Sequence, residues 1–176
     1  YIFLQIKKGM NYFMTKPYDR ISAVAYSKKW ALSRNPKYYN FDPVGGDCTS
    51  FISQCLYAGS KIMNYTPIKG WYYRSGFDKS PSWSGVEFLY NFLVQNNGAG
   101  PRGSLVSQDK VDIGDIAQLS FSGTKFEHSL FIIDVNDINN LNRIHIATHT
   151  YDALHKGIGE YSFSKIRFIH INDVGI

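Results

Sequence analysis

The sequence contains little cysteine, and this excludes a fold held together by a framework of disulfide bridges. Its 176 residues include two cysteines, Cys48 and Cys55. If both lie on one helix, their Cα atoms are about 10 Å apart, because each residue rises about 1.5 Å. A disulfide needs a separation below about 7 Å. We therefore expect two free thiols and a fold that is stabilised by its hydrophobic core.

Long apolar runs and dense basic tracts are also missing. No stretch approaches the ~18 apolar residues of a membrane-spanning helix, so no membrane span is expected. The formal net charge of +5 is spread along the chain, with only short basic pairs such as Lys7-Lys8 and Lys28-Lys29. Nucleic acid is therefore not an expected partner. The charge is compatible with weak attraction to an anionic substrate or surface.

Aromatic residues, in contrast, are abundant. They make up 16% of the chain, with 13 Tyr, 12 Phe and 3 Trp. Such side chains bury large areas, which favours a dense core. Two of the tryptophans, Trp71 and Trp83, lie in a long polar and aromatic connection, and we predict that they form a wall for the substrate. The alternative is that they only cover the core.

The order of the patterns predicts an α+β fold. Helical patterns follow Pro17 and cover residues 48–58 and 86–94, the last opened by a predicted capping box from Ser84 to Glu87. Strand patterns cover residues 116–121, 129–135, 143–150 and 161–171. Helices followed by consecutive strands predict N-terminal helices packed on an antiparallel β-sheet. We assign residues 1–16 to an N-terminal extension and 17–176 to one domain. The start at Tyr1 indicates a chain processed or excised from a longer one.

Cys48 is the first candidate for chemistry. It follows Gly45-Gly46-Asp47, where the glycines allow a sharp turn and Asp47 suits a helix cap. A cysteine at the first helical position can have a lowered thiol pKa, because the helix dipole and unpaired amides stabilise a thiolate. The same amides can donate to an oxyanion. Cys55 lies two turns further along an apolar stripe and is interpreted as a core residue.

A thiol nucleophile needs a base, and His128 lies directly before the start of a predicted strand. A hairpin centred near residue 139 pairs residues whose numbers sum to about 278, so His128 faces the neighbourhood of His149 and Thr150. Cross-strand neighbours lie within roughly 5 Å of each other. We therefore predict that His149 orients His128, with Asp152 as the reserve candidate.

Two other classes of site are weaker. A zinc site formed by Cys48, His128, His145 and His149 lacks the close ligand pairs that such sites use. A serine hydrolase would need a Gly-x-Ser-x-Gly elbow, which the sequence does not contain. We therefore expect neither a metal nor another cofactor.

The segment Gly46-Asp47-Cys48-Thr49-Ser50-Phe51-Ile52-Ser53-Gln54-Cys55 resembles the nucleophile segment of the "putative amidase domain" family, a branch of the papain-like cysteine hydrolases. That branch is akin to the NlpC-type and CHAP-type cell-wall peptidases of bacteria. The similarity continues through Gly114-Asp115-Ile116, His128-Ser129-Leu130 and Thr148-His149-Thr150. It covers roughly residues 18–171.

The resemblance implies a papain-like, NlpC-type fold and an amidase or peptidase that cleaves an amide bond through a thioester. Cys48 corresponds to the nucleophile and His128 to the base, whereas the third position varies among relatives. Bacterial peptidoglycan peptides are the implied substrate class, and an extracellular or cell-wall location follows from it. Two alternatives stay open. One is a transglutaminase-like acyl transferase, and the other is a non-catalytic module that binds a cell wall or a glycan.

Overall fold

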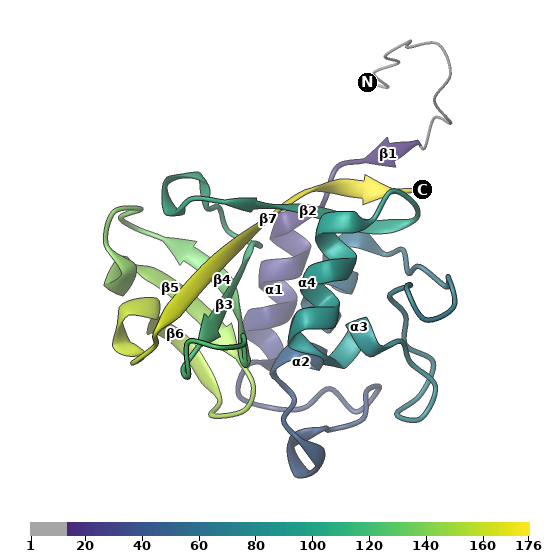
Figure 1. The fold of residues 1–176 in the computed structure, drawn as a ribbon, viewed down its shortest axis with the longest axis horizontal. Helices are drawn as coiled ribbons and strands as arrows, with labels where there is room; N and C mark the ends of the chain where they lie inside the picture. The colour runs from purple at the N-terminus through teal and green to yellow at the C-terminus, as the bar shows by residue number, and fades with distance from the viewer. Residues whose placement is uncertain (1–13) are drawn as a thin grey trace.

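The computed structural model describes residues 14–176 and shows helices packed against one curved β-sheet (Figure 1). The α-helices are α1 (Arg20–Trp30), α2 (Cys48–Ser60), α3 (Pro81–Ser84) and α4 (Val86–Gln95). Short 3-10 turns are η1 (Asp42–Val44), η2 (Gln108–Lys110), η3 (Leu141–Arg143) and η4 (Ile158–Glu160). The α+β class is therefore confirmed.

The sheet has seven strands: β1 (Thr15–Lys16), β2 (Gly100–Val106), β3 (Ile116–Ser120), β4 (His128–Val135), β5 (Ile144–Thr148), β6 (Ala153–Gly157) and β7 (Lys165–Gly175). Their order is β1-β7-β3-β4-β5-β6, with β2 also paired to β7, and every pairing is antiparallel. β1 lies inside the predicted N-terminal extension and pairs with the end of β7. Residues 1–13 of that extension lie outside the described residues.

Each face of the sheet carries its own hydrophobic cluster, because side chains alternate along a strand. Phe131 and Ile133 of β4 belong to the cluster that the helices cover. Leu130 and Ile132 alternate with them along the strand and belong to the cluster on the opposite face. This alternation decides on which side of the sheet each candidate site residue lies.

Several expected elements are confirmed, with small shifts at their ends. The helix predicted at residues 48–58 continues to Ser60 and closes at Lys61, which is left-handed with φ 58°. The predicted hairpin register is confirmed by the pairs Phe131↔Ala147 and Ile132↔Ile146. The capping box is wrong: Ser84 ends α3, and Gly85 takes the N-cap position of α4 without a side-chain hydrogen bond.

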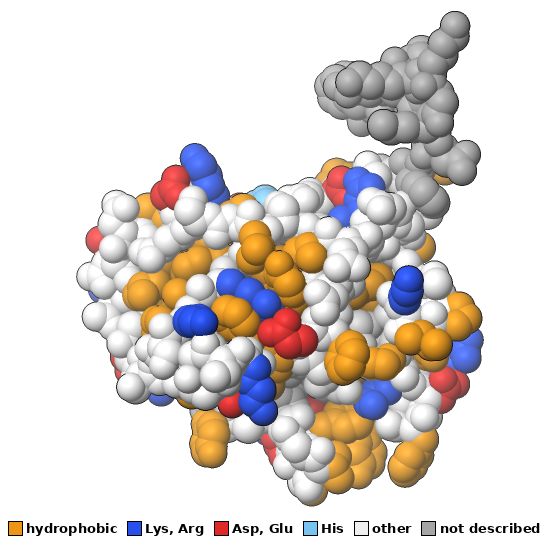
Figure 2. Space-filling model, viewed as in Figure 1, with side chains coloured by type: hydrophobic (Ala, Val, Ile, Leu, Met, Phe, Trp, Pro, Cys, Tyr) orange, Lys and Arg blue, Asp and Glu red, His pale blue; other side chains and the backbone are white. Residues whose placement is uncertain are grey.

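The face seen in Figure 2 carries hydrophobic side chains with Lys, Arg and acidic groups between them, and the basic groups are scattered there. Within residues 14–176, no helix has the length and apolarity that crossing a bilayer requires.

Candidate active site

Cys48 is the first residue of α2, at the end of the helix that points toward β4 and β5. Its side chain is 7% exposed. Burial raises the pKa of the Cys48 thiol, while hydrogen bonds from the Ser129 backbone and from Thr49 act in the opposite direction. The lowered thiol pKa expected from the helix dipole is therefore corrected, because desolvation outweighs the favourable contacts at this position.

Asp47 occupies the N-cap position but does not cap the helix with its side chain. One carboxylate oxygen, Oδ1, accepts a hydrogen bond from the Phe41 backbone N–H at 3.2 Å. The other, Oδ2, lies 2.6 Å from His149 Nδ1. The first-turn amides of α2 are thus left without the side-chain acceptor that a capping aspartate supplies. They remain available to an anion at the Cys48 end.

His149 is almost completely enclosed, with 1% of its surface exposed. Its Nε2 lies 2.8 Å from the Trp30 carbonyl oxygen, and its ring stacks on Phe51 with 4.0 Å between centroids. The carboxylate and the carbonyl thus engage both ring nitrogens of His149. His149 therefore forms a buried hydrogen-bonded pair with Asp47.

His128 lies on a different side of the sheet. It pairs with Leu119, and its side chain points to the same face of the sheet as that of Leu130, two residues further along β4. Both leucines belong to the cluster on the face opposite the helices. Its ring lies near Phe121 and Tyr161, with centroid separations of 6.2 and 6.1 Å. Burial lowers the pKa of His128 to about 4, and the charge of nearby Lys156 adds to this effect.

The next residue of β4, Ser129, faces α2 instead. Its hydroxyl lies 3.1 Å from Thr49 Oγ1 and accepts a hydrogen bond from Gln118 Nε2 at 3.2 Å. Its carbonyl accepts from Thr148 Oγ1 at 2.9 Å. The Cys48 thiol thus contacts the backbone of Ser129, the residue that follows His128 on β4. No hydrogen bond among the described residues joins the side chains of Cys48 and His128.

The predicted contact between His149 and His128 is not formed. Both nitrogens of His149 are used by Asp47 and Trp30, and His128 Nε2 is buried without a hydrogen-bond partner. The reserve candidate, Asp152, is exposed and forms a two-point ion pair with Arg34, at 2.9 and 2.8 Å. Sequence reasoning missed the Asp47–His149 pair, because only the folded loop brings these residues together.

The predicted substrate wall is also corrected. Trp71 and Trp83 have no exposed surface, and their rings pack against each other with centroids 5.2 Å apart. Trp71 Nε1 donates to Ser53 Oγ at 2.9 Å. Neither indole offers a face to a substrate in this structure, so both are core residues.

Among residues 14–176, no group of three or more His, Cys, Asp or Glu side chains is arranged to hold a metal ion. Both cysteines are free and buried.

Comparison with known proteins places these features in a family. The model of the family described as "Putative amidase domain" matches residues 17–171. "Uncharacterized protein YhbB" from Bacillus subtilis (strain 168) is 35% identical over 141 residues, which cover 77% of this chain and 42% of that protein. The chain thus spans less than half the length of this relative. No solved structure matches the chain. On the family match, the chain belongs to the "Putative amidase domain" family, whose name indicates amide-bond hydrolysis.

Proposed function

We propose that this domain is a cysteine amidase or peptidase that cleaves an amide bond through a thioester formed on Cys48. One observation carries the proposal: Cys48 begins α2 at an end where the cap carboxylate is drawn away to His149. The thiol therefore stands beside amides that can bind the oxyanion of a tetrahedral intermediate.

The pKa shifts support a reaction that starts from neutral partners. The pKa of the Cys48 thiol is raised, and that of His128 is lowered to about 4. At neutral pH the site then holds a thiol and a neutral imidazole rather than a preformed ion pair. A neutral imidazole can accept the thiol proton as the sulfur attacks, which is general-base catalysis.

His128 is the proposed base because its imidazole is free to accept a proton. Its buried Nε2 has no partner, an arrangement that costs about 1–3 kcal/mol and calls for an explanation. His149 has no nitrogen left, because both lie within hydrogen-bond distance of an oxygen, Asp47 Oδ2 and the Trp30 carbonyl. Because His128 lies on the opposite face of the sheet, the proposal requires the backbone at the start of β4, where Ser129 already contacts the thiol, to shift when substrate binds so that His128 reaches Cys48.

The steps balance without a cofactor. Cys48 Sγ bonds to the carbonyl carbon, and the thiol proton passes through His128 to the leaving amine as the C–N bond breaks. Water then hydrolyses the thioester, which releases the acid and returns the proton to the thiol.

The finer assignments are also proposals. A papain-like, NlpC-type or CHAP-type fold is supported by the order of a helix-borne cysteine followed by an antiparallel sheet that carries the histidine. The proposed substrates are peptides of the bacterial cell wall, which would place the protein outside the cell or in the wall. This substrate class rests on the resemblance of the Cys48 segment to those peptidases.

The test is digestion of purified peptidoglycan and of its soluble muropeptides, followed by mass spectrometry of the products. The wild-type domain should release fragments with a new amine and a new carboxyl group, and Cys48→Ala should release none. Cys55→Ala is the matched control, because Cys55 is fully buried in the core and should leave cleavage intact. Cleavage that survives Cys48→Ala would overturn the mechanism.

The same assay separates the alternatives. An acyl transferase would attach an added amine such as hydroxylamine to the new carboxyl end, in preference to water. A binding module would retain peptidoglycan equally well with or without Cys48 and leave it uncut. Either result would replace the hydrolase assignment.

A further inference from the structure

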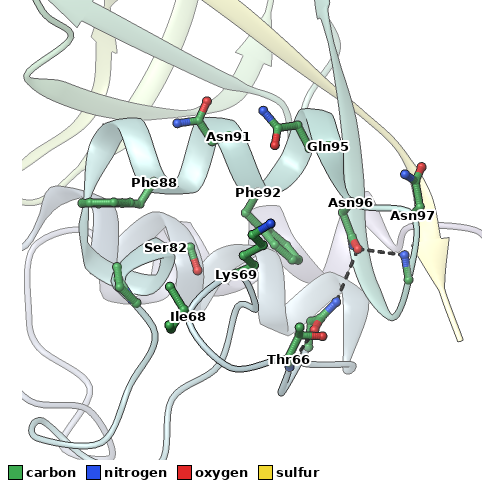
Figure 3. A pocket seen from close by; sticks show the side chains of 13 residues that line it. Thr66, Ile68, Lys69, Ser82, Phe88, Asn91, Phe92, Gln95, Asn96 and Asn97 are labelled. Carbon is green, nitrogen blue, oxygen red and sulfur yellow. Dashed lines mark hydrogen bonds between the residues drawn. The ribbon is translucent and has the colours of Figure 1, made fainter.

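A second candidate site lies away from Cys48, in a trough between α4 and the loop of residues 64–70. The cavity has a volume of about 540 Å³, and Figure 3 shows side chains reaching it from the helix on one side and the loop on the other. This volume is in the range of small-ligand sites. Cys48, Asp47, His128 and His149 are not among the residues that line it.

The polar groups that line the trough are mainly carboxamides. Asn91 and Gln95 lie four residues apart on α4, so both occupy one face of the helix. Asn97 follows the end of the helix. All three side chains are exposed and make no hydrogen bond to another described residue. Each offers two N–H donors and one carbonyl acceptor to a ligand.

The floor beneath these amides is cross-linked by hydrogen bonds of Asn96 and Asn64. The Asn96 carboxamide oxygen accepts from the Gly98 backbone N–H at 2.9 Å and from Asn64 Nδ2 at 3.4 Å, as the dashed lines in Figure 3 mark. Asn96 Nδ2 donates to the carbonyls of Ala99 and Pro101, at 2.9 and 3.0 Å. These two asparagines are occupied in holding the loop, which leaves the outer three for a ligand.

Two apolar side chains border the trough and are open to solvent. Phe88 is 60% exposed on the same stripe of α4, and Ile68 is 82% exposed on the facing loop. Ile68 also has φ 63°, a left-handed conformation that is costly for a β-branched residue. Such a conformation persists only where the surrounding structure imposes it, and it is common at ligand-contacting positions.

The charge of the trough limits the ligand. Lys69 is the one charged group among the described residues that line it, and no carboxylate is present there. A ligand that is dense in both donors and acceptors, uncharged, and flat enough to stack on Phe88 meets these conditions.

We infer that this trough binds a neutral chain of acetamido sugars, independently of the chemistry proposed for Cys48. The acetamido N–H and C=O match the donors and acceptors of Asn91 and Gln95, and the apolar face of a sugar ring packs on Phe88.

The test is titration of the Cys48→Ala domain with N-acetylchitotetraose by calorimetry, with cellotetraose and a blocked tetrapeptide as comparison ligands. The chitooligosaccharide should bind, and Phe88→Ala and the double variant Asn91→Ala/Gln95→Ala should each raise Kd at least about tenfold. Lys69→Gln should change Kd less than about threefold, because the ligand is uncharged. Phe77→Ala and Asn139→Ala, exposed residues outside the trough, are the matched controls.

Four outcomes would overturn the inference. These are no binding at millimolar concentration, binding that ignores the trough variants, equal binding of cellotetraose, and preferential binding of the tetrapeptide. Because Cys48 is absent from the tested protein, failure here is independent of whether the domain cleaves amides.

Discussion

Asp47 Oδ2 lies 2.6 Å from His149 Nδ1, in a place where each side chain is only 1% exposed. The pair joins the residue before Cys48 to the end of β5, and Arg34 Nε stands 3.7 Å from the same carboxylate oxygen. It thereby holds the start of α2 against the sheet and keeps the helix amides free of their usual cap.

Removing one member of this pair should destabilise the fold strongly. Asp47→Ala leaves the buried His149 Nδ1 and the Phe41 backbone N–H without their acceptor, and we expect the free energy of unfolding to fall by about 1–3 kcal/mol for each buried group left unpaired. Urea unfolding followed by circular dichroism measures this change. Asp109→Ala is the control: its carboxylate is exposed beside Lys110, and its loss should change the free energy of unfolding little. A value for Asp47→Ala as small as the control would show that the pair is not structural.

His128 should make stability depend on pH. Its folded pKa of about 4 lies below the ordinary value of 6.5, so the unfolded chain binds a proton first as pH falls. The contribution of His128 to the free energy of unfolding is fully present above about pH 6.5 and is lost as the pH falls toward about 4. The free energy of unfolding should change by about 3 kcal/mol over this range.

The measurement compares wild type with His128→Gln by urea unfolding at about pH 7 and about pH 4. The difference between the two proteins should shift by about 3 kcal/mol, with wild type losing more at low pH. His155→Gln, at an exposed position, should follow wild type at both pH values. A His128→Gln protein with the same pH dependence as wild type would argue against the lowered pKa.

Cys48 should react slowly with iodoacetamide at neutral pH in the free protein. Burial raises the pKa of its thiol, so the rate should climb only above the ~8.5 of an ordinary cysteine. Mass spectrometry at Cys48 and Cys55 follows the reaction, and Cys55, with no exposed surface, should remain unlabelled until the protein unfolds. Fast labelling of Cys48 with a midpoint well below pH 8.5 would show instead that the pKa of its thiol is lowered, as the helix dipole predicts.

The two buried tryptophans should differ in how well they tolerate replacement by phenylalanine. Trp71→Phe leaves Ser53 Oγ without its indole partner, whereas Trp83 Nε1 has no hydrogen-bond partner to lose. We therefore expect Trp71→Phe to lower the free energy of unfolding by about 1–3 kcal/mol more than the cavity left by the smaller side chain accounts for. Thermal unfolding of both variants, with Phe77→Ala as an exposed control, makes the comparison. Equal losses in both variants would contradict the role given to the Ser53 contact.

Some strands could not be read from the sequence. β2 contains Gly100, Pro101 and Gly103, which weaken a strand pattern, and among residues 14–176 its one partner strand is β7. β6, with the sequence Ala-Leu-His-Lys-Gly, does not alternate apolar and polar residues. Both strands exist because a neighbouring strand supplies their hydrogen bonds, which is a property of the fold rather than of the segment.

The local pattern around residue 48 determined that a cysteine would begin a buried helix, and the hairpin centre determined the β4–β5 register. Both depend on residues close together in the chain. Tertiary structure decided which nitrogen faces which oxygen: it turned Asp47 from a cap into the partner of His149, and it placed His128 on the far face of the sheet. Desolvation, which raises the pKa of Cys48 and lowers that of His128, depends on packing by distant segments, and neighbours in sequence do not encode it.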